Sequence, residues 1–150
     1  MANRKFWIGM LVIVLVFGMT VSGCKTDPEE ENDGVFTLIN IPSEYNGKYA
    51  YLEAANDNVD LQGGDYNSST DTFTAILISN GSVSLPIWTG DNNSVYRYSG
   101  NHTVEVYLGI LNTADMNSDE IGALHFDSVT FSNGNATKSF GDGEWEDSVY

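Results

Sequence analysis

Apolar and polar residues alternate with a period of two in several stretches after residue 35, which is typical of strands half buried in a sheet. The clearest alternation covers residues 102–111, where Thr103, Glu105 and Tyr107 share the polar face. The apolar positions of this stretch are Val104, Val106, Leu108 and Ile110. We therefore predict a strand here, at the centre of the core.

Short apolar runs bounded by Gly, Asn, Asp and Ser predict the other strands, and no stretch of useful length has the period of an amphipathic helix. The predicted strands are residues 35–41, 48–55, 72–79, 83–88, 95–98, 121–126, 128–132 and 136–140, with a long polar loop at 56–71. Asn80-Gly81 and Asn133-Gly134 are typical two-residue hairpin turns, and Pro86 indicates an edge strand. The pattern predicts an all-β fold, a single antiparallel β-sandwich of about seven to eight strands. A small lipocalin-like β-barrel is the alternative, because the number of strands does not separate the two.

The first 24 residues have the three parts of a secretory signal peptide: a basic start, an apolar run at residues 6–21, and the small residues Ser22 and Gly23. Cleavage would fall before Cys24, the only cysteine of the chain. A lone free thiol in an exported protein would be unpaired and reactive, so we predict that Cys24 carries lipid. Several acyl chains would then anchor the protein stably. An uncleaved transmembrane helix, for which the run is short, and a cleaved but unlipidated signal are the alternatives.

This N-terminus resembles the bacterial lipoprotein signal, with Val21 at a position where Leu is more usual. Residues 41–49, Ile-Pro-Ser-Glu-Tyr-Asn-Gly-Lys-Tyr, resemble a segment of small treponemal lipoproteins of unassigned function, whose signals also carry Val third before the cysteine. The resemblance covers the signal and the first two strands, and more loosely the later hairpins. It implies an envelope-anchored β domain in a spirochaete-like cell, and it implies no activity, cofactor or catalytic residue.

Composition divides the chain into four parts. Residues 1–23 are the predicted signal peptide, and residues 24–34 are the lipidated cysteine with an acidic, disordered tether that could extend about 30 Å. Residues 35–141 form the β domain, and residues 142–150 are an acidic tail whose one large apolar group is Trp145.

The charge is strongly one-sided. The chain has 21 acidic and 6 basic residues, a net charge of −15. Without the signal, which holds two of the basic residues and no acid, the net charge is −17. Such a surface repels phosphate backbones and anionic lipids, so we predict no nucleic-acid binding and membrane contact through the anchor alone.

The sequence lacks the pattern of a catalytic site. His102 starts a predicted strand and His125 lies between Leu124 and Phe126, and neither has a recognisable nucleophile beside it. No Gly-x-Ser-x-Gly motif occurs, and no Cys or His cluster suits zinc or iron. We therefore predict that the protein is not an enzyme.

Asp115, Asn117 and Asp119 have the spacing that begins a calcium loop. The sixth position, normally Gly, is Glu120, and the twelfth, normally Glu, is Phe126. The pattern favours an ordinary polar loop and no cofactor, with a loose calcium site as the alternative.

Trp88, Tyr96 and Tyr98 flank the polar residues Asp91 and Asn92. Flat rings beside carboxylate and amide groups are typical of sites that bind carbohydrates or peptides. The competing interpretation is that these rings pack within strands, which aromatic residues favour.

Taken together, these patterns predict a lipid-anchored envelope protein, at the outer membrane, that acts as a non-catalytic module binding a protein or carbohydrate. It would face either the host and surrounding matrix or the periplasm. A periplasmic carrier of small molecules and a structural envelope lipoprotein are the alternatives.

Overall fold

The computed structural model describes residues 33–54, 59–91 and 94–147. The predicted signal peptide, Cys24 and most of the predicted tether lie outside these residues, as does Asn92. Within the described part of the chain, no helix is long and apolar enough to cross a membrane. The elements are β1 (Val35–Ile39), η1 (Ser43–Tyr45), β2 (Tyr49–Ala54), β3 (Leu61–Gly63), β4 (Asp65–Asn67), β5 (Thr72–Thr74), β6 (Ile76–Leu77), β7 (Val83–Asp91), β8 (Ser94–Arg97), β9 (Thr103–Leu111), β10 (Glu120–Thr130), β11 (Ala136–Ser139), η2 (Phe140–Asp142) and β12 (Glu144–Asp147).

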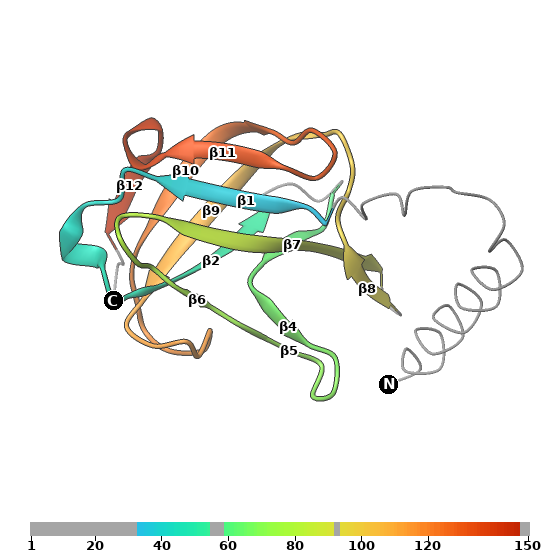
Figure 1. The fold of residues 1–150 in the computed structure, drawn as a ribbon, viewed down its shortest axis with the longest axis horizontal. Coiled ribbons are helices and arrows are strands. Elements are labelled where there is room, and N and C mark those ends of the chain that lie inside the picture. Colours follow the sequence, from blue (N-terminus) through green and yellow to red (C-terminus); the bar gives the residue numbers. More distant parts are fainter. Residues whose placement is uncertain (1–32, 55–58, 92–93, 148–150) are drawn as a thin grey trace, which may run out of the picture.

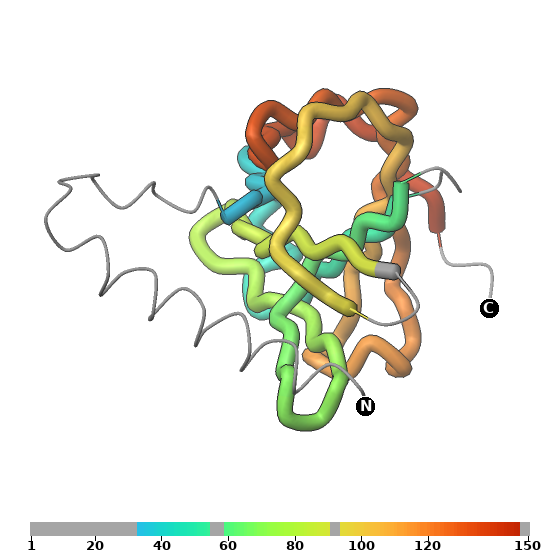
Figure 2. The backbone as a smooth tube through the Cα atoms, turned by 90° about the vertical axis from the view of Figure 1, so that its right-hand side faces the viewer, coloured from blue at the N-terminus to red at the C-terminus, as the bar shows by residue number. Residues whose placement is uncertain are grey.

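Ten of these strands form one curled sheet, and the prediction of an all-β fold is confirmed. The main order is β11-β1-β7-β3-β2-β9-β10-β12, with β6 beside β2 and β8 beside β7. The sheet curls around its core as a half-barrel (Figures 1 and 2). All pairs in the sheet are antiparallel except β1 and β11, which run parallel. Strands β4 and β5 form a separate hairpin that projects from the body (Figure 1).

The core lies on the inner face of this curl. β9 is interior, between β2 and β10, and its predicted apolar face is buried: Val104, Val106, Leu108 and Ile110 are each at most 3% exposed. Rings from distant strands meet across the core, as Phe36 of β1 packs edge-on against Phe126 of β10 at 6.2 Å. Burial of this apolar area, with no disulfide, is what stabilises the domain.

Both predicted Asn-Gly turns are present. Asn80 and Gly81 have φ of 53° and 70°, and Asn133 and Gly134 have φ of 49° and 79°. Two consecutive residues with positive φ define the type I′ turn that matches strand twist, which explains the Asn-Gly sequence at both places.

The folded domain begins earlier and ends later in the chain than predicted. Gly34, assigned to the tether, is buried, and its N–H donates to the Tyr98 carbonyl at 3.0 Å. Strand β12, inside the predicted acidic tail, pairs with β10. The sequence pattern did not predict this strand, because its acidic side chains are exposed and only the indole of Trp145 packs against the core.

The middle of the chain also differs from its prediction. The region assigned to a long polar loop, residues 56–71, contains the short strands β3 and β4. β7, assigned to an edge because of Pro86, is interior, since β1 pairs with its first half and β3 with its second.

The two strands predicted at 121–126 and 128–132 are one strand, β10, with an irregularity between Phe126 and Val129. Phe126 pairs with Val106 and Val129 pairs with Val104, so Asp127 and Ser128 together lie opposite Glu105. This arrangement is a β-bulge, in which two residues of one strand face one residue of its neighbour.

Candidate functional site

The aromatic group predicted from the sequence does not form a single patch. Trp88 pairs with Arg97 and Thr89 pairs with Tyr96 across the β7–β8 hairpin. Because successive residues of a strand point to opposite faces, Trp88 and Tyr96 lie on opposite faces of this hairpin. Tyr96 is 51% exposed, whereas Tyr98 is only 5% exposed and belongs to the core. Asp91 is the last residue of β7 and pairs with Ser94.

Trp88 is instead surrounded by rings from the β4–β5 hairpin. Its ring centroid lies 5.2 Å from that of Tyr66 and 6.5 Å from that of Phe73, and those two rings are 4.8 Å apart. The guanidinium carbon of Arg97 lies 5.1 Å from the centre of the Trp88 ring. We call Trp88, Tyr66, Phe73 and Arg97 the Trp88 ledge.

Hydrogen bonds hold this ledge in place. The indole N–H of Trp88 donates to the carbonyl of Gly64 at 2.9 Å, and Arg97 Nη2 donates to the carbonyl of Gly34 at 2.7 Å. The Tyr66 hydroxyl donates to Asp71 Oδ1 at 2.7 Å. Burial, and then the hydrogen bond to Asp71, raise the pKa of Tyr66 to about 12. Fixed rings bind a flat ligand with a smaller loss of conformational entropy than mobile rings would.

A shallow depression of about 70 Å³ adjoins the ledge. Phe73, Trp88 and Val95 supply its apolar lining, and its polar side chains are Asp60, Gln62 and Thr89. Sites that enclose a drug-sized molecule measure roughly 300–1,000 Å³, so this feature is a contact surface and encloses no such molecule.

The strand register extends this surface across the sheet. Each residue of one row pairs directly with the next on the neighbouring strand, from β8 to β12. We call this row the outer row; in order it consists of Arg97, Trp88, Gln62, Glu53, Tyr107, His125 and Glu144.

The outer row faces solvent because its chain neighbours face the core. Ile87, Leu52, Leu108 and Leu124 each adjoin a member of the row and are 0% exposed. Alternation along each strand then places the row on the opposite, outer face. Adjacent strands lie about 4.8 Å apart, so Trp88 and Tyr107, three strands apart, are separated by about 14 Å.

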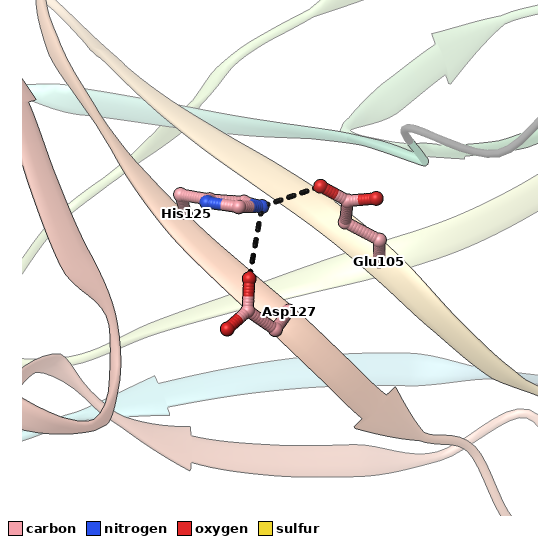
Figure 3. Close-up of side chains that lie close together, drawn as sticks. All are labelled: Glu105, His125 and Asp127. Atoms are coloured by element: carbon pink, nitrogen blue, oxygen red, sulfur yellow. Dashed lines mark hydrogen bonds and ion pairs between the residues drawn. The ribbon is translucent and has the colours of Figure 1, made fainter.

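The second aromatic group of the row lies at its β9–β10 end. The rings of Tyr107 and His125 are stacked, with centroids 4.5 Å apart and planes 10° apart. His125 Nε2 lies 2.6 Å from Glu105 Oε1 and 3.6 Å from Asp127 Oδ1 (Figure 3). Burial, and then the negative charges of Glu105, Glu146 and Asp127, raise the pKa of Tyr107.

Carboxylates also shape the middle of the outer face. The Tyr51 hydroxyl donates to Glu120 Oε2 at 2.6 Å, and burial together with this bond raises the pKa of Tyr51 well above its usual value. Burial, and then the charges of Glu120 and Asp60, raise the pKa of Glu53. Together with Glu105, Asp127 and Glu146, these carboxylates outnumber Arg97 on the outer face, and this excess of negative charge disfavours anionic ligands.

The loop predicted as a calcium site is a tight turn with its own hydrogen bonds. Asp115 Oδ1 accepts from the Asn117 backbone N–H at 2.9 Å and from its side-chain Nδ2 at 3.1 Å. The Ser118 hydroxyl donates to the Asp115 carbonyl at 2.6 Å, while Asp119 is exposed. These contacts are those of an ordinary polar turn, and calcium binding by Asp115, Asn117 and Asp119 stays a prediction.

The comparisons with known proteins add no relative: no family model, no curated protein and no solved structure matches this chain. The site must therefore be interpreted from its geometry.

Proposed function

We propose that the protein is a lipid-anchored binding module of a bacterial cell envelope, that it is not an enzyme, and that the outer row contacts its ligand. The observation that carries this proposal is the register itself. It aligns an aromatic group at Trp88 with a second one at Tyr107 and His125, and it places Gln62 and Glu53 between them. Rings that stack on a ligand, with amide and carboxylate groups that orient it, are what a binding surface requires.

A neutral glycan is the ligand class that suits this surface best. Sugar rings present apolar faces that stack on Trp88 and Tyr107, and hydroxyl groups that hydrogen-bond to Gln62 and Glu53. The negative potential of the outer face disfavours sulfated and phosphorylated glycans. The shallow shape of the surface suits a chain that lies across the strands.

The full-length protein in detergent micelles, applied to an array of neutral and anionic glycans, tests this proposal. Loss of one aromatic contact is worth about 0.5–1.5 kcal/mol, so Trp88→Ala is expected to weaken binding between about two- and tenfold. Tyr96→Ala is the matched control, because Tyr96 is exposed on the other face of the same hairpin. Equal losses in the two variants would remove the outer row from consideration.

The anchor rests on Cys24 and the export signal, and it is tested separately. We expect the wild-type protein to incorporate labelled fatty acid and Cys24→Ala to incorporate none, because the variant has no thiol to carry lipid. Protease added to intact cells then separates the two sides of the envelope. Rapid loss of a tag placed after Tyr150, with a periplasmic control protein intact, would indicate surface exposure, and protection would indicate a periplasmic domain.

A further inference from the structure

We infer that Glu105, His125 and Asp127 form a binding site for a divalent transition-metal ion of the zinc type on the outer face of β9 and β10. Figure 3 shows both carboxylates directed at the same imidazole nitrogen. This site is separate from the Trp88 ledge, and it does not depend on glycan binding.

The three donor atoms already lie close enough to share one ion. His125 Nε2 is 2.6 Å from Glu105 Oε1 and 3.6 Å from Asp127 Oδ1, and all three donor atoms lie within 4.8 Å of one another. Zinc bonds of about 2.0–2.2 Å in tetrahedral geometry place two ligand atoms about 3.4 Å apart. Asp127 is near this spacing, and Glu105 reaches it by a shift of about 1 Å. The Glu105 side chain is 42% exposed and has room for that movement.

The third ligand, Asp127, lies on the same strand as His125 and at the start of the bulge in β10. Phe126 and Val129 are both buried, and the two residues between them, Asp127 and Ser128, are exposed. Alternation along β10 places Asp127 on the same face as His125, and the bulge leaves Asp127 and Ser128 together opposite Glu105. Bulges are common next to functional sites.

Neighbouring groups fix the orientation of the imidazole. The Tyr107 ring stacks on His125 at 4.5 Å and nearly parallel, which restricts rotation of the His125 ring. On the other side, Glu146 Oε1 of β12 lies 4.0 Å from His125 Nδ1. Metal-bound histidines usually donate from their second ring nitrogen to a carboxylate, and Glu146 is the carboxylate that a shift of about 1 Å would bring into that position.

Charge also favours a cation here. Glu105, Asp127 and Glu146 surround one imidazole, and no lysine or arginine of the described residues forms an ion pair with them. A divalent ion would replace the proton between His125 and Glu105 and neutralise two of the three negative charges. One nitrogen and two oxygen donors suit zinc better than calcium, which prefers oxygen ligands alone. The side chain of Asp127 is 87% exposed, so water or an external ligand has access to the remaining coordination position.

Calorimetric titration of zinc chloride into the metal-free, full-length protein in micelles tests this site. The protein used in this titration carries a purification tag without histidine, so that the tag supplies no metal ligands. We expect one saturable zinc ion per chain, and we expect Asp127→Asn and His125→Gln each to weaken binding at least about tenfold. Asp127→Asn is the more informative variant, because a side chain this exposed contributes little to folding. His102→Gln removes the other histidine of the chain and is expected to leave the affinity unchanged.

Three results would overturn the site. These are the absence of a saturable ion in the wild-type protein, equal affinities in the wild type and both variants, and a loss in His125→Gln without a loss in Asp127→Asn. The second of these is the result expected if zinc binds diffusely to the acidic surface. Circular dichroism of each variant establishes that it is folded before its affinity is compared.

Discussion

Tyr107 and His125 face each other across β9 and β10, and their rings stack with planes only 10° apart. The pair connects the two proposed activities of the outer face. Tyr107 offers a ring to a ligand on the outer row, and it also stacks on the imidazole that Glu105, Asp127 and Glu146 contact. A change at Tyr107 is therefore expected to affect stability, glycan binding and metal binding together.

The stability effect of this pair is measured most simply without metal. Tyr107→Ala is expected to lower the free energy of unfolding by about 0.5–1.5 kcal/mol, because the stacked contact is lost. Tyr107→Phe keeps the ring and is expected to remain close to wild type. Urea unfolding followed by circular dichroism provides the comparison, and equal stabilities of the Ala and Phe variants would contradict the role given to the stack.

The last strand is expected to be part of the folded unit. Trp145 of β12 lies 5.3 Å from Tyr45 and 6.0 Å from Phe140, between ring centroids. Trp145→Ala removes both contacts, and we expect a loss of about 2 kcal/mol, less than for a fully buried Trp. Trp145→Phe is the control that retains a ring. Urea unfolding measures the effect. If Trp145→Ala is as stable as the wild type, β12 is not needed for the stability of the domain.

The start of the domain makes a similar prediction. A Cβ atom added to Gly34 would lie 2.2 Å from the Tyr98 carbonyl oxygen and 2.5 Å from that of Gly134. Gly34→Ala is therefore expected to destabilise the domain by about 1–3 kcal/mol, as overpacking does. Gly141→Ala is the matched control, because no atom lies within 4 Å of its added Cβ. Equal melting temperatures for the two variants would place Gly34 outside the folded domain.

Residue patterns predicted the local structure of the sheet well and its boundaries poorly. Residues 102–111 were predicted correctly because their alternation is strict, and the Asn-Gly turns because few other sequences adopt two positive φ angles. β12 was missed because its three acids outweigh one Trp in any local pattern. The parallel pairing of β1 with β11 depends on contacts between residues about 100 positions apart, which local patterns do not contain.

Alkaline pH tests the raised pKa of Tyr66, which results from burial and then from the hydrogen bond to Asp71. An unfolded tyrosine loses its proton near pH 10, whereas the native Tyr66 retains it until about pH 12. The unfolded state is therefore favoured progressively between these values, and stability falls as pH rises through them. Tyr66→Phe, which has no ionisable proton, is expected to show a shallower fall in urea unfolding between pH 9 and 12. Identical slopes in both proteins would contradict the raised pKa.

The sequence predicted only part of the candidate site. Trp88 was identified because it lies beside polar residues, but its ring neighbours Tyr66 and Phe73 come from a hairpin whose first strand was assigned to a loop. Tyr98 was placed with Trp88, although it is buried at the end of the hairpin. His125 was treated as an ordinary strand residue, because Glu105 comes from another strand and its place opposite Asp127 becomes visible only in the pairing of β9 with β10.

We propose that one extended ligand contacts both aromatic groups of the outer row, at Trp88 and at Tyr107, and the length of the ligand tests this most directly. The affinities of Trp88→Ala and Tyr107→Ala are compared for a short oligosaccharide and for one longer than the span of about 14 Å between the two rings. We predict that both variants weaken binding of the long ligand and that no more than one of them weakens binding of the short ligand. If Tyr107→Ala leaves the affinity for the long ligand unchanged, the proposal is contradicted and the site is confined to the Trp88 ledge.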